Sequence, residues 1–285
     1  MADVKRVHTF HAEASVLDAQ LQRPLQQDVR PQAFAKLPRE GGYLSERAEN
    51  FRLEGVISFR SAYTQVAGNL SAKPDHGWVT LATSVIEGLN VLDVVTADRV
   101  VAQISTEHPL LVGHVPSVTF LGTRFENLKI AGHDVRPTLN LDMCGQTPAG
   151  DKPYLLDAAF MAQVSKQNET LVAASSLPES VRSNYRGKLP DSAQLRKEWD
   201  AFIAGKRPKP KAAVECSLVA SLGATKPWNS AGHVIEVPEF GRVFLAELKV
   251  DCDTFGLTMI RLDMGCVAHG GTQASTAVVN GTTRP

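Results

Sequence analysis

The chain has 285 residues, of which 43% are hydrophobic and 21% are charged. These values are ordinary for a globular protein with a large buried core, and they exclude a disordered chain or a coiled coil. Thirty basic and thirty acidic side chains cancel, so no net field draws the molecule to nucleic acid or to an anionic membrane. We therefore expect neither nucleic acid nor a membrane as a partner.

The amino terminus, residues 1–8, lacks the apolar core of a signal peptide. No apolar run reaches the roughly 18 to 20 residues that span a bilayer. We therefore expect a cytoplasmic protein, with export by a route without a classical signal peptide left open. The four cysteines contain no Cys-x-x-Cys pair, so a zinc site is not expected. Buried thiols and a disulfide between Cys252 and Cys266 are the two alternatives.

The first half of the chain reads as a series of strands. Residues Val7 to Leu17 alternate loosely and predict a first strand, whereas Gln20 to Gly42 is polar, contains three prolines and predicts an irregular excursion. The run 51–59 alternates cleanly, with Phe51 and Phe59 on one face, and predicts a single half-buried strand.

Two longer runs, Trp78 to Glu87 and Val91 to Ser105, are rich in the β-branched residues that suit a pleated surface. The segment Gly88-Leu89-Asn90 permits a turn between them, which predicts a long hairpin. Shorter strands are expected at residues 115–121, 124–130 and 135–141. Strands this close together, without helical crossovers, run antiparallel to their neighbours. The predicted fold class is mainly β, an antiparallel β-sandwich or barrel with a helical insertion.

The helical insertion is expected between residues 150 and 212. The alanine-rich stretch 154–167 is compatible with a helix. A second helix is indicated by a capping box, Asp191 to Gln194, by apolar residues at helical spacing after it, and by Gly205 in the stop position. The basic, proline-containing segment Lys206 to Lys211 reads as a solvated linker.

Strand character resumes at Val214 to Leu222. We therefore divide the chain into a discontinuous β domain, residues 1–149 and 213–285, and a helical insertion, residues 150–212, that covers an edge or an end of the sheet.

Near the carboxyl end, Arg242 to Val250 and Leu257 to Met264 alternate and predict a β-hairpin with one wet face. Phe244 is expected on its apolar face, and Glu247 on its wet face. The turn, Asp251 to Gly256, has the first spacings of a calcium loop but lacks the final glutamate, so we expect an ordinary acidic turn.

A short repeat in the sequence leads to an expectation about topology. Leu262-Asp-Met-Gly-Cys266 in the hairpin is nearly repeated as Leu141-Asp-Met-Cys-Gly145 before the insertion. This repetition predicts two equivalent sheet positions on either side of the helical insertion.

Carboxylates close to an apolar stretch are candidates for hydrolysis. Two of them facing each other across a groove could cleave a glycoside, and a solvated strand end is the alternative. The candidates are Glu236, Glu239, Glu247, Asp251 and Asp263.

The histidines offer a weaker candidate site. His8 and His11 are three residues apart on a strand and therefore point to opposite faces. Three others could converge on a metal if their loops meet, with Asp98 or Asp134 adding oxygen, and solvated loop positions are the alternative. These are His108, His114 and His133. Among the tryptophans, Trp228 is expected to be available for binding and Trp199 to lie in the core.

No nucleophile elbow, phosphate loop, dinucleotide fingerprint or His-Glu-x-x-His motif occurs. We therefore assign no catalytic, cofactor-binding or metal-ligating residue, and we expect no cofactor.

The segment from Gly232 to Cys266 resembles the end of a group of uncharacterised bacterial β-rich proteins. The segment from Val94 to Gly132, with Val-Thr-Ala-Asp-Arg and Phe-Glu-Asn-Leu-Lys-Ile-Ala-Gly, is similar to choice-of-anchor bacterial proteins. The resemblance implies a β fold and no activity.

The leading hypothesis is a non-enzymatic β-rich protein that self-associates into an oligomer or a filament, or that binds a ligand such as a glycan. It depends on the abundance of strands, the neutral charge and the absence of catalytic motifs. The alternative is a hydrolase or lyase that uses carboxylates or histidines in a groove beneath the helical insertion.

Overall fold

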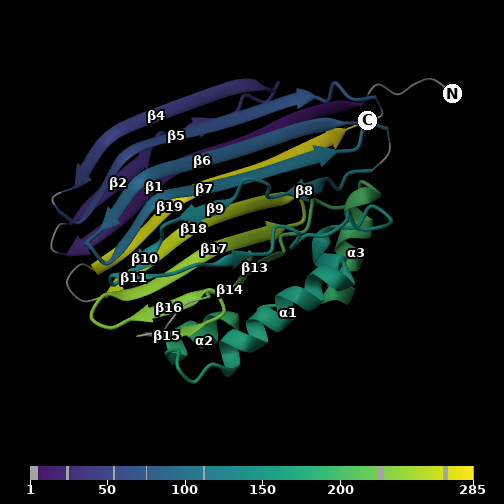
Figure 1. Cartoon of the computed structure of the whole chain (residues 1–285). Coiled ribbons are helices and arrows are strands. Elements are labelled where there is room, and N and C mark those ends of the chain that lie inside the picture. The colour runs from purple at the N-terminus through teal and green to yellow at the C-terminus, as the bar shows by residue number, and fades with distance from the viewer. Residues whose placement is uncertain are drawn as a thin grey trace.

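The computed structural model describes residues 6–23, 26–53, 55–74, 76–111, 113–223, 228–265 and 269–284. Within these ranges two large antiparallel sheets pack face to face, and helices lie along one side of them (Figure 1). This arrangement confirms the predicted β-sandwich with a helical insertion. In the described part of the chain, no helix combines the length and apolarity needed to cross a membrane.

The first sheet has nine strands among the described residues, in the order β15-β16-β17-β18-β19-β1-β2, with β13 beside β17 and β3 beside β1. The first and last strands, β1 and β19, are neighbours along almost their whole length. Its strands are β1 (Val7–Arg23), β2 (Gln27–Gln32), β3 (Ala35–Lys36), β13 (Ala213–Ser217), β15 (Asn229–Ala231), β16 (Val234–Val237), β17 (Gly241–Asp251), β18 (Thr254–Gly265) and β19 (His269–Arg284).

The second sheet has eight described strands in the order β11-β10-β7-β6-β5-β4, with β8 and β9 also paired to β7. Its strands are β4 (Gly42–Leu53), β5 (Ile57–Leu70), β6 (Trp78–Val91), β7 (Val95–His108), β8 (Ser117–Thr119), β9 (Arg124–Glu126), β10 (Lys129–Ile130) and β11 (His133–Asp134). A separate pair joins β12 (Thr138–Leu139) to β14 (Val219–Ser221).

The helices follow each other between the two β regions of the chain. They are η1 (Tyr154–Leu156), α1 (Ala158–Ala173), α2 (Glu179–Tyr185) and α3 (Ser192–Ile203). The predicted helix start at Asp191 is confirmed, because its carboxylate accepts the backbone N–H groups of Ala193 and Gln194. Helix α2 was missed by the sequence pattern. The proposed domain boundaries at residues 150 and 212 stay a prediction.

A hydrophobic core fills the space between the sheets, and a second, smaller cluster lies outside it. The smaller cluster packs α1 and α2 against the outer face of β16 and β17, so the helices cover part of the nine-stranded sheet. Its buried residues are Leu171, Leu177, Val181, Tyr185, Val234 and Phe244.

In each sheet, at least one strand contains a residue at which the alternation of buried and exposed side chains shifts by one position. In β17, Leu245 and Leu248 are both fully buried although they are three positions apart, because Ala246 between them has a φ of 48°. Phe244 therefore faces α2 and not the main core, so its predicted place on the core face is wrong. Gly88 of β6, with a φ of 65°, is the corresponding residue in the second sheet.

The run 51–59 is a hairpin and not the single predicted strand. Strand β4 ends at Leu53 and β5 begins at Ile57, and between them Gly55 has a φ of 74°. Phe51 and Phe59 are cross-strand partners whose rings stack 5.1 Å apart. The apolar side chains after the turn point to the same face as those before it. The alternation of apolar and polar residues therefore continues through the turn, and the sequence pattern does not reveal it.

The long hairpin of β6 and β7 is confirmed, but its predicted turn is wrong. The chain reverses at Leu92 and Asp93, which both have a φ above 50°. The prediction of an irregular excursion over residues 20–42 is also wrong in part, because β1 continues to Arg23 and β2 follows.

The two similar pentapeptides do not occupy equivalent positions. Residues 262–265 belong to β18, whereas residues 141–144 form a turn that is closed by a bond from Gly145 N–H to the Asp142 carbonyl. The predicted equivalence is therefore wrong: local sequence alone does not decide between strand and turn, because neighbouring strands supply the pairing in one case only.

Candidate functional site

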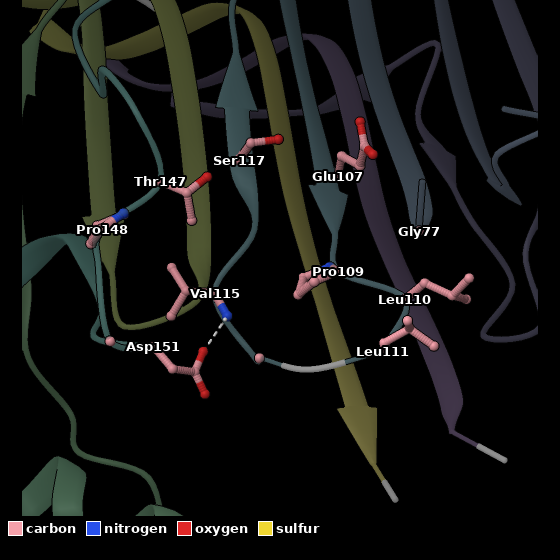
Figure 2. A pocket seen from close by; sticks show the side chains of 12 residues that line it. Gly77, Glu107, Pro109, Leu110, Leu111, Val115, Ser117, Thr147, Pro148 and Asp151 are labelled. Carbon is pink, nitrogen blue, oxygen red and sulfur yellow. Dashed lines mark hydrogen bonds between the residues drawn. The ribbon is translucent and has the colours of Figure 1, made fainter. Parts of the chain in front are cut away.

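A pocket lies at one end of the strands, and we call it the terminal pocket (Figure 2). Its volume is about 740 Å³, within the range that small-molecule sites occupy. One wall is the connection from β7 to β8, and the other is the loop before η1. The lining residues are Gly77, Glu107, Pro109, Leu110, Leu111, Gly113, Val115, Ser117, Thr147, Pro148, Gly150 and Asp151.

Asp151 fixes the two walls relative to each other. Its Oδ1 accepts the backbone N–H groups of His114 and of Val115, the second at 3.0 Å. Figure 2 shows the bond to Val115. Its carbonyl accepts the indole N–H of Trp199 at 3.0 Å, which ties the loop to α3. A side chain that satisfies two backbone donors of the opposite loop holds that loop in one conformation.

Arg6, which precedes β1, and Tyr154 of η1 also hold the β7 to β8 connection in place. The Arg6 guanidinium donates to the carbonyls of Pro109 and Gly113, and the Tyr154 hydroxyl donates to the Pro116 carbonyl at 3.1 Å. Gly113 has a φ of 111°, which a side chain would strain. The pocket is therefore shaped before any ligand enters.

The chemistry of the terminal pocket is divided between an apolar surface and an oxygen-rich rim. Its polar side chains are the carboxylates of Glu107 and Asp151 and the hydroxyls of Ser117 and Thr147, and no lysine or arginine is among its described lining residues. Glu107 also pairs with His76 at 2.6 Å. The arrangement suits a ligand with an apolar body and hydrogen-bond donors at one end.

A nucleophile and base are not assembled there. His114 Nε2 lies 4.0 Å from Asp151 Oδ2, and no hydroxyl hydrogen-bonds to that imidazole within the described residues. Base-activated attack requires the nucleophile to be hydrogen-bonded to the base. Within the described residues, this pocket therefore shows no nucleophile that is hydrogen-bonded to a base.

The predicted carboxylates divide among three other places. Glu236, Glu239 and Asp263 border a groove of about 440 Å³, the carboxylate groove, together with Arg242. Burial raises the pKa of Glu236, although Arg242 lies 3.6 Å away and opposes the shift. None of the described lining residues of this groove belongs to the range 150–212.

Glu247 lies outside the carboxylate groove, under α2, in an ion-pair network. Arg261 donates to both oxygens of Glu247, at 2.6 and 2.9 Å, and to Asp263 at 2.9 Å. The guanidinium also lies 3.6 Å from the ring centre of Phe244. His233 is 3.8 Å from Glu247 and 3.3 Å from the Tyr185 hydroxyl.

The turn from β17 to β18 is the acidic turn that the sequence predicts. Asp251 Oδ1 accepts the backbone N–H groups of Asp253 and Thr254, whereas Asp253 pairs with Lys209 of the basic linker. Phe255, which stands at a ligand position of a calcium loop, is buried in the core.

The three histidines that could have converged on a metal do not meet, and His108 is not in the solvated loop position expected as the alternative. His108 is fully buried at the end of β7, whereas His133 follows β10, which pairs with the opposite end of β7 at Val95 and Thr96. Thirteen residues of extended strand separate those ends, or roughly 40 Å. Asp98 bonds to Asn127, and Asp134 pairs with Arg136.

His8 and His11 point to opposite faces of β1, as predicted, and His8 meets His108 in the interior. Their ring centres are 4.6 Å apart, and the His8 ring stacks on Trp78. Sequence reasoning missed this pair because 100 residues separate its members. Gly281 is the sequence feature that fits this pair, because a Cβ at that position would lie 2.6 Å from the His8 ring.

Trp199, Trp228 and the three described cysteines are buried. Trp199 lies in the core as predicted, but Trp228 is only 7% exposed, so its expected availability for binding is wrong. Cys252 is a free thiol, and Cys266, its expected disulfide partner, lies outside the described residues. Burial raises the pKa of Cys144 to about 12 and that of Cys252 to about 11, which makes both thiols unreactive.

Comparison with known proteins gives a family but no activity. The model of a domain of unknown function, DUF8256, matches residues 8–251, so the chain belongs to that family. No curated protein and no solved structure matches the chain. The match agrees with the expectation of a family without an assigned activity, and the similarity to choice-of-anchor proteins stays a prediction.

Proposed function

We propose that this protein is a non-enzymatic binding protein whose terminal pocket takes an amphipathic molecule with a hydrogen-bond-donating head, such as a protonated amine. The observation that carries the proposal is one pre-shaped pocket that combines an apolar surface with polar side chains that all end in oxygen atoms. Pro109, Leu110 and Val115 supply apolar surface, and Glu107 supplies a carboxylate that attracts a cation.

A glycan is the less favoured ligand for this pocket. Sugars bind on exposed aromatic faces, and none of the described lining residues is aromatic. The hydrolase alternative is placed second for a different reason. Its best acid, Glu236, has a raised pKa, as acid catalysis requires, but Arg242 engages the same carboxyl group.

The compartment belongs to the same proposal. Three described cysteines are free and buried, and unbridged thiols persist in reducing compartments. We therefore keep the cytoplasm as the proposed location.

Titration calorimetry with two probes of equal chain length, dodecylamine and dodecanoate, tests the function. Both are used below their micelle-forming concentrations. We expect the amine to bind at least tenfold more tightly, since a carboxylate head would face Glu107 and Asp151.

A matched pair of variants locates the binding. Glu107→Gln should weaken the amine by about tenfold, because it removes a charge from the rim. Glu126→Gln, on an exposed strand outside the pocket, should leave the affinity unchanged. Equal affinity for both probes, no binding of either, or equal behaviour of the two variants contradicts the proposal.

A further inference from the structure

The eight-stranded sheet ends in a free strand edge. Strand β4 pairs with β5 from Gly42 to Leu53, and no other described strand pairs with its opposite side. In Figure 1 it forms the border of the molecule away from the helices. Its twelve residues are more than an average strand contains. The unpaired backbone groups of such an edge are a template for another strand.

The first part of β4, residues 42–47, is exposed, whereas Leu53 at its end belongs to the hydrophobic core. Val66 of β5 is fully buried, whereas its partner on β4, Leu44, is 37% exposed on the same face. On the opposite face Tyr43 is 63% exposed. A strand with apolar side chains uncovered on both faces gains burial when another strand pairs beside it.

The other sheet shows how this chain protects an edge. Its terminal strand β2 has only six residues and contains Pro31, which cannot donate to a ladder. β4 contains neither proline nor lysine. Two residues of β4 have a positive φ: Gly42 at its start, with 108°, and Asn50, with 53°. They leave the segment from Tyr43 to Glu49 open for pairing.

We propose that two copies of this chain associate through β4, antiparallel about a twofold axis, so that their eight-stranded sheets become one continuous sheet. This interface is independent of the terminal pocket, which lies at the strand ends. In an antiparallel pair the two residues opposite each other are of the same hydrogen-bonding type. A twofold axis between two copies of one strand therefore passes midway between a residue and its own copy.

Charge and backbone shape exclude most positions of that axis. An axis at Glu46 or at Arg47 places identical charges directly opposite each other, which is destabilising. An axis at Ala48 requires pairing across the bend at Asn50. An axis close to Gly42 shortens the paired segment.

The axis at Ser45 satisfies all three conditions. Arg47 then lies opposite Tyr43 of the second copy, on the face where Arg47 already pairs with Glu49. A guanidinium beside an aromatic ring is attractive, and symmetry provides this contact twice. On the other face Leu44 lies opposite Glu46 of the second copy, and no like charges meet.

Sedimentation of the full chain over a range of concentrations tests the association. We expect the wild type to form a dimer, and Leu44→Asp to weaken it by about tenfold or more, because the new carboxylate faces Glu46 of the second copy. Leu121→Asp, at a 69% exposed position on the β8 to β9 connection, is the matched control and should dimerise like the wild type. Circular dichroism shows whether each variant is folded.

Cysteine cross-linking tests the register, with the unmodified chain as background. Ser45→Cys should join two copies on mild oxidation, because residues opposite each other have Cβ atoms about 5 Å apart. Glu49→Cys should not, since the two copies of that residue are separated by eight strand positions, or roughly 26 Å. A wild type that stays monomeric, an assembly insensitive to Leu44→Asp, or cross-linking at Glu49 and not at Ser45 overturns the proposal.

Discussion

Glu247 and Arg261 are two charges that the outer face of the nine-stranded sheet keeps largely away from water. Burial alone would raise the pKa of Glu247, but His233 and Arg261 reverse that effect and lower it to about 2. Because Glu247 is the bidentate partner of Arg261, removing either residue leaves the other charge beneath α2 with its weaker partner only, Asp263 or His233. The pair fixes how the helix meets the sheet.

Glu247→Gln should therefore lower the free energy of unfolding by about 1–3 kcal/mol, since Arg261 loses its bidentate acceptor. The double variant Glu247→Leu/Arg261→Met should recover part of that loss, because it removes the buried charge as well. Urea denaturation of the two single variants and the double variant measures the coupling. Additive effects of the two single changes contradict this account.

The β4–β5 hairpin illustrates the same logic for an element. Gly55 has a φ of 74° and no atom within 4 Å of the position that a Cβ would occupy. Gly55→Ala should therefore destabilise the protein by about 1 kcal/mol through backbone strain alone, and Gly55→Asn by less, since asparagine tolerates this conformation. Thermal unfolding of both variants checks the order. Equal stability of Gly55→Ala and the wild type contradicts it.

The same hairpin shows what the sequence could and could not reveal. Alternation correctly indicated strands, an antiparallel sandwich and the C-terminal hairpin. It could not reveal the turn at Gly55, because Leu53 and Ile57 are cross-strand partners on one face and keep the period unbroken. It also misplaced Phe244, because Ala246 shifts the buried face by one residue through its backbone conformation and leaves no mark in composition.

The candidate site was beyond sequence reasoning for a different reason. The terminal pocket is built from two connections with no shared motif, and its shape depends on contacts between residues far apart in the chain. Arg6 reaches Gly113 across 107 positions, and Asp151 reaches Val115 across 36. Three of the carboxylates suspected from sequence, Glu236, Glu239 and Asp263, do lie together at one groove.

At the scale of the whole molecule, the chain ends close the sandwich over a pair of buried histidines. His8 of β1 and His108 of β7 lie between the sheets, and the absence of a side chain at Gly281 of β19 makes room for them. Within the described residues neither ring nitrogen of His108 has a hydrogen-bond partner. A buried imidazole without partners is tolerated only in its neutral form.

The pH dependence of stability follows from this arrangement. Burial, with a smaller effect of Arg6, lowers the pKa of His8 to about 4, and burial, with the neighbouring His8, lowers that of His108 to about 3. In the unfolded chain both titrate near 6.5. Below pH 6.5 the unfolded state therefore binds more protons than the folded state. The free energy of unfolding has its full value above that pH and decreases as the pH drops toward 4 and then 3.

His108→Leu should flatten that fall. Each histidine contributes a slope of about 1.4 kcal/mol per pH unit between its two pKa values, and leucine fills the site without a titrating group. His11→Leu, at a half-exposed position on the opposite face of β1, should keep the wild-type slope. Urea unfolding from pH 7 to pH 4 measures the three profiles. If the profiles of His108→Leu and the wild type are parallel, the closure of the sandwich does not depend on these neutral histidines.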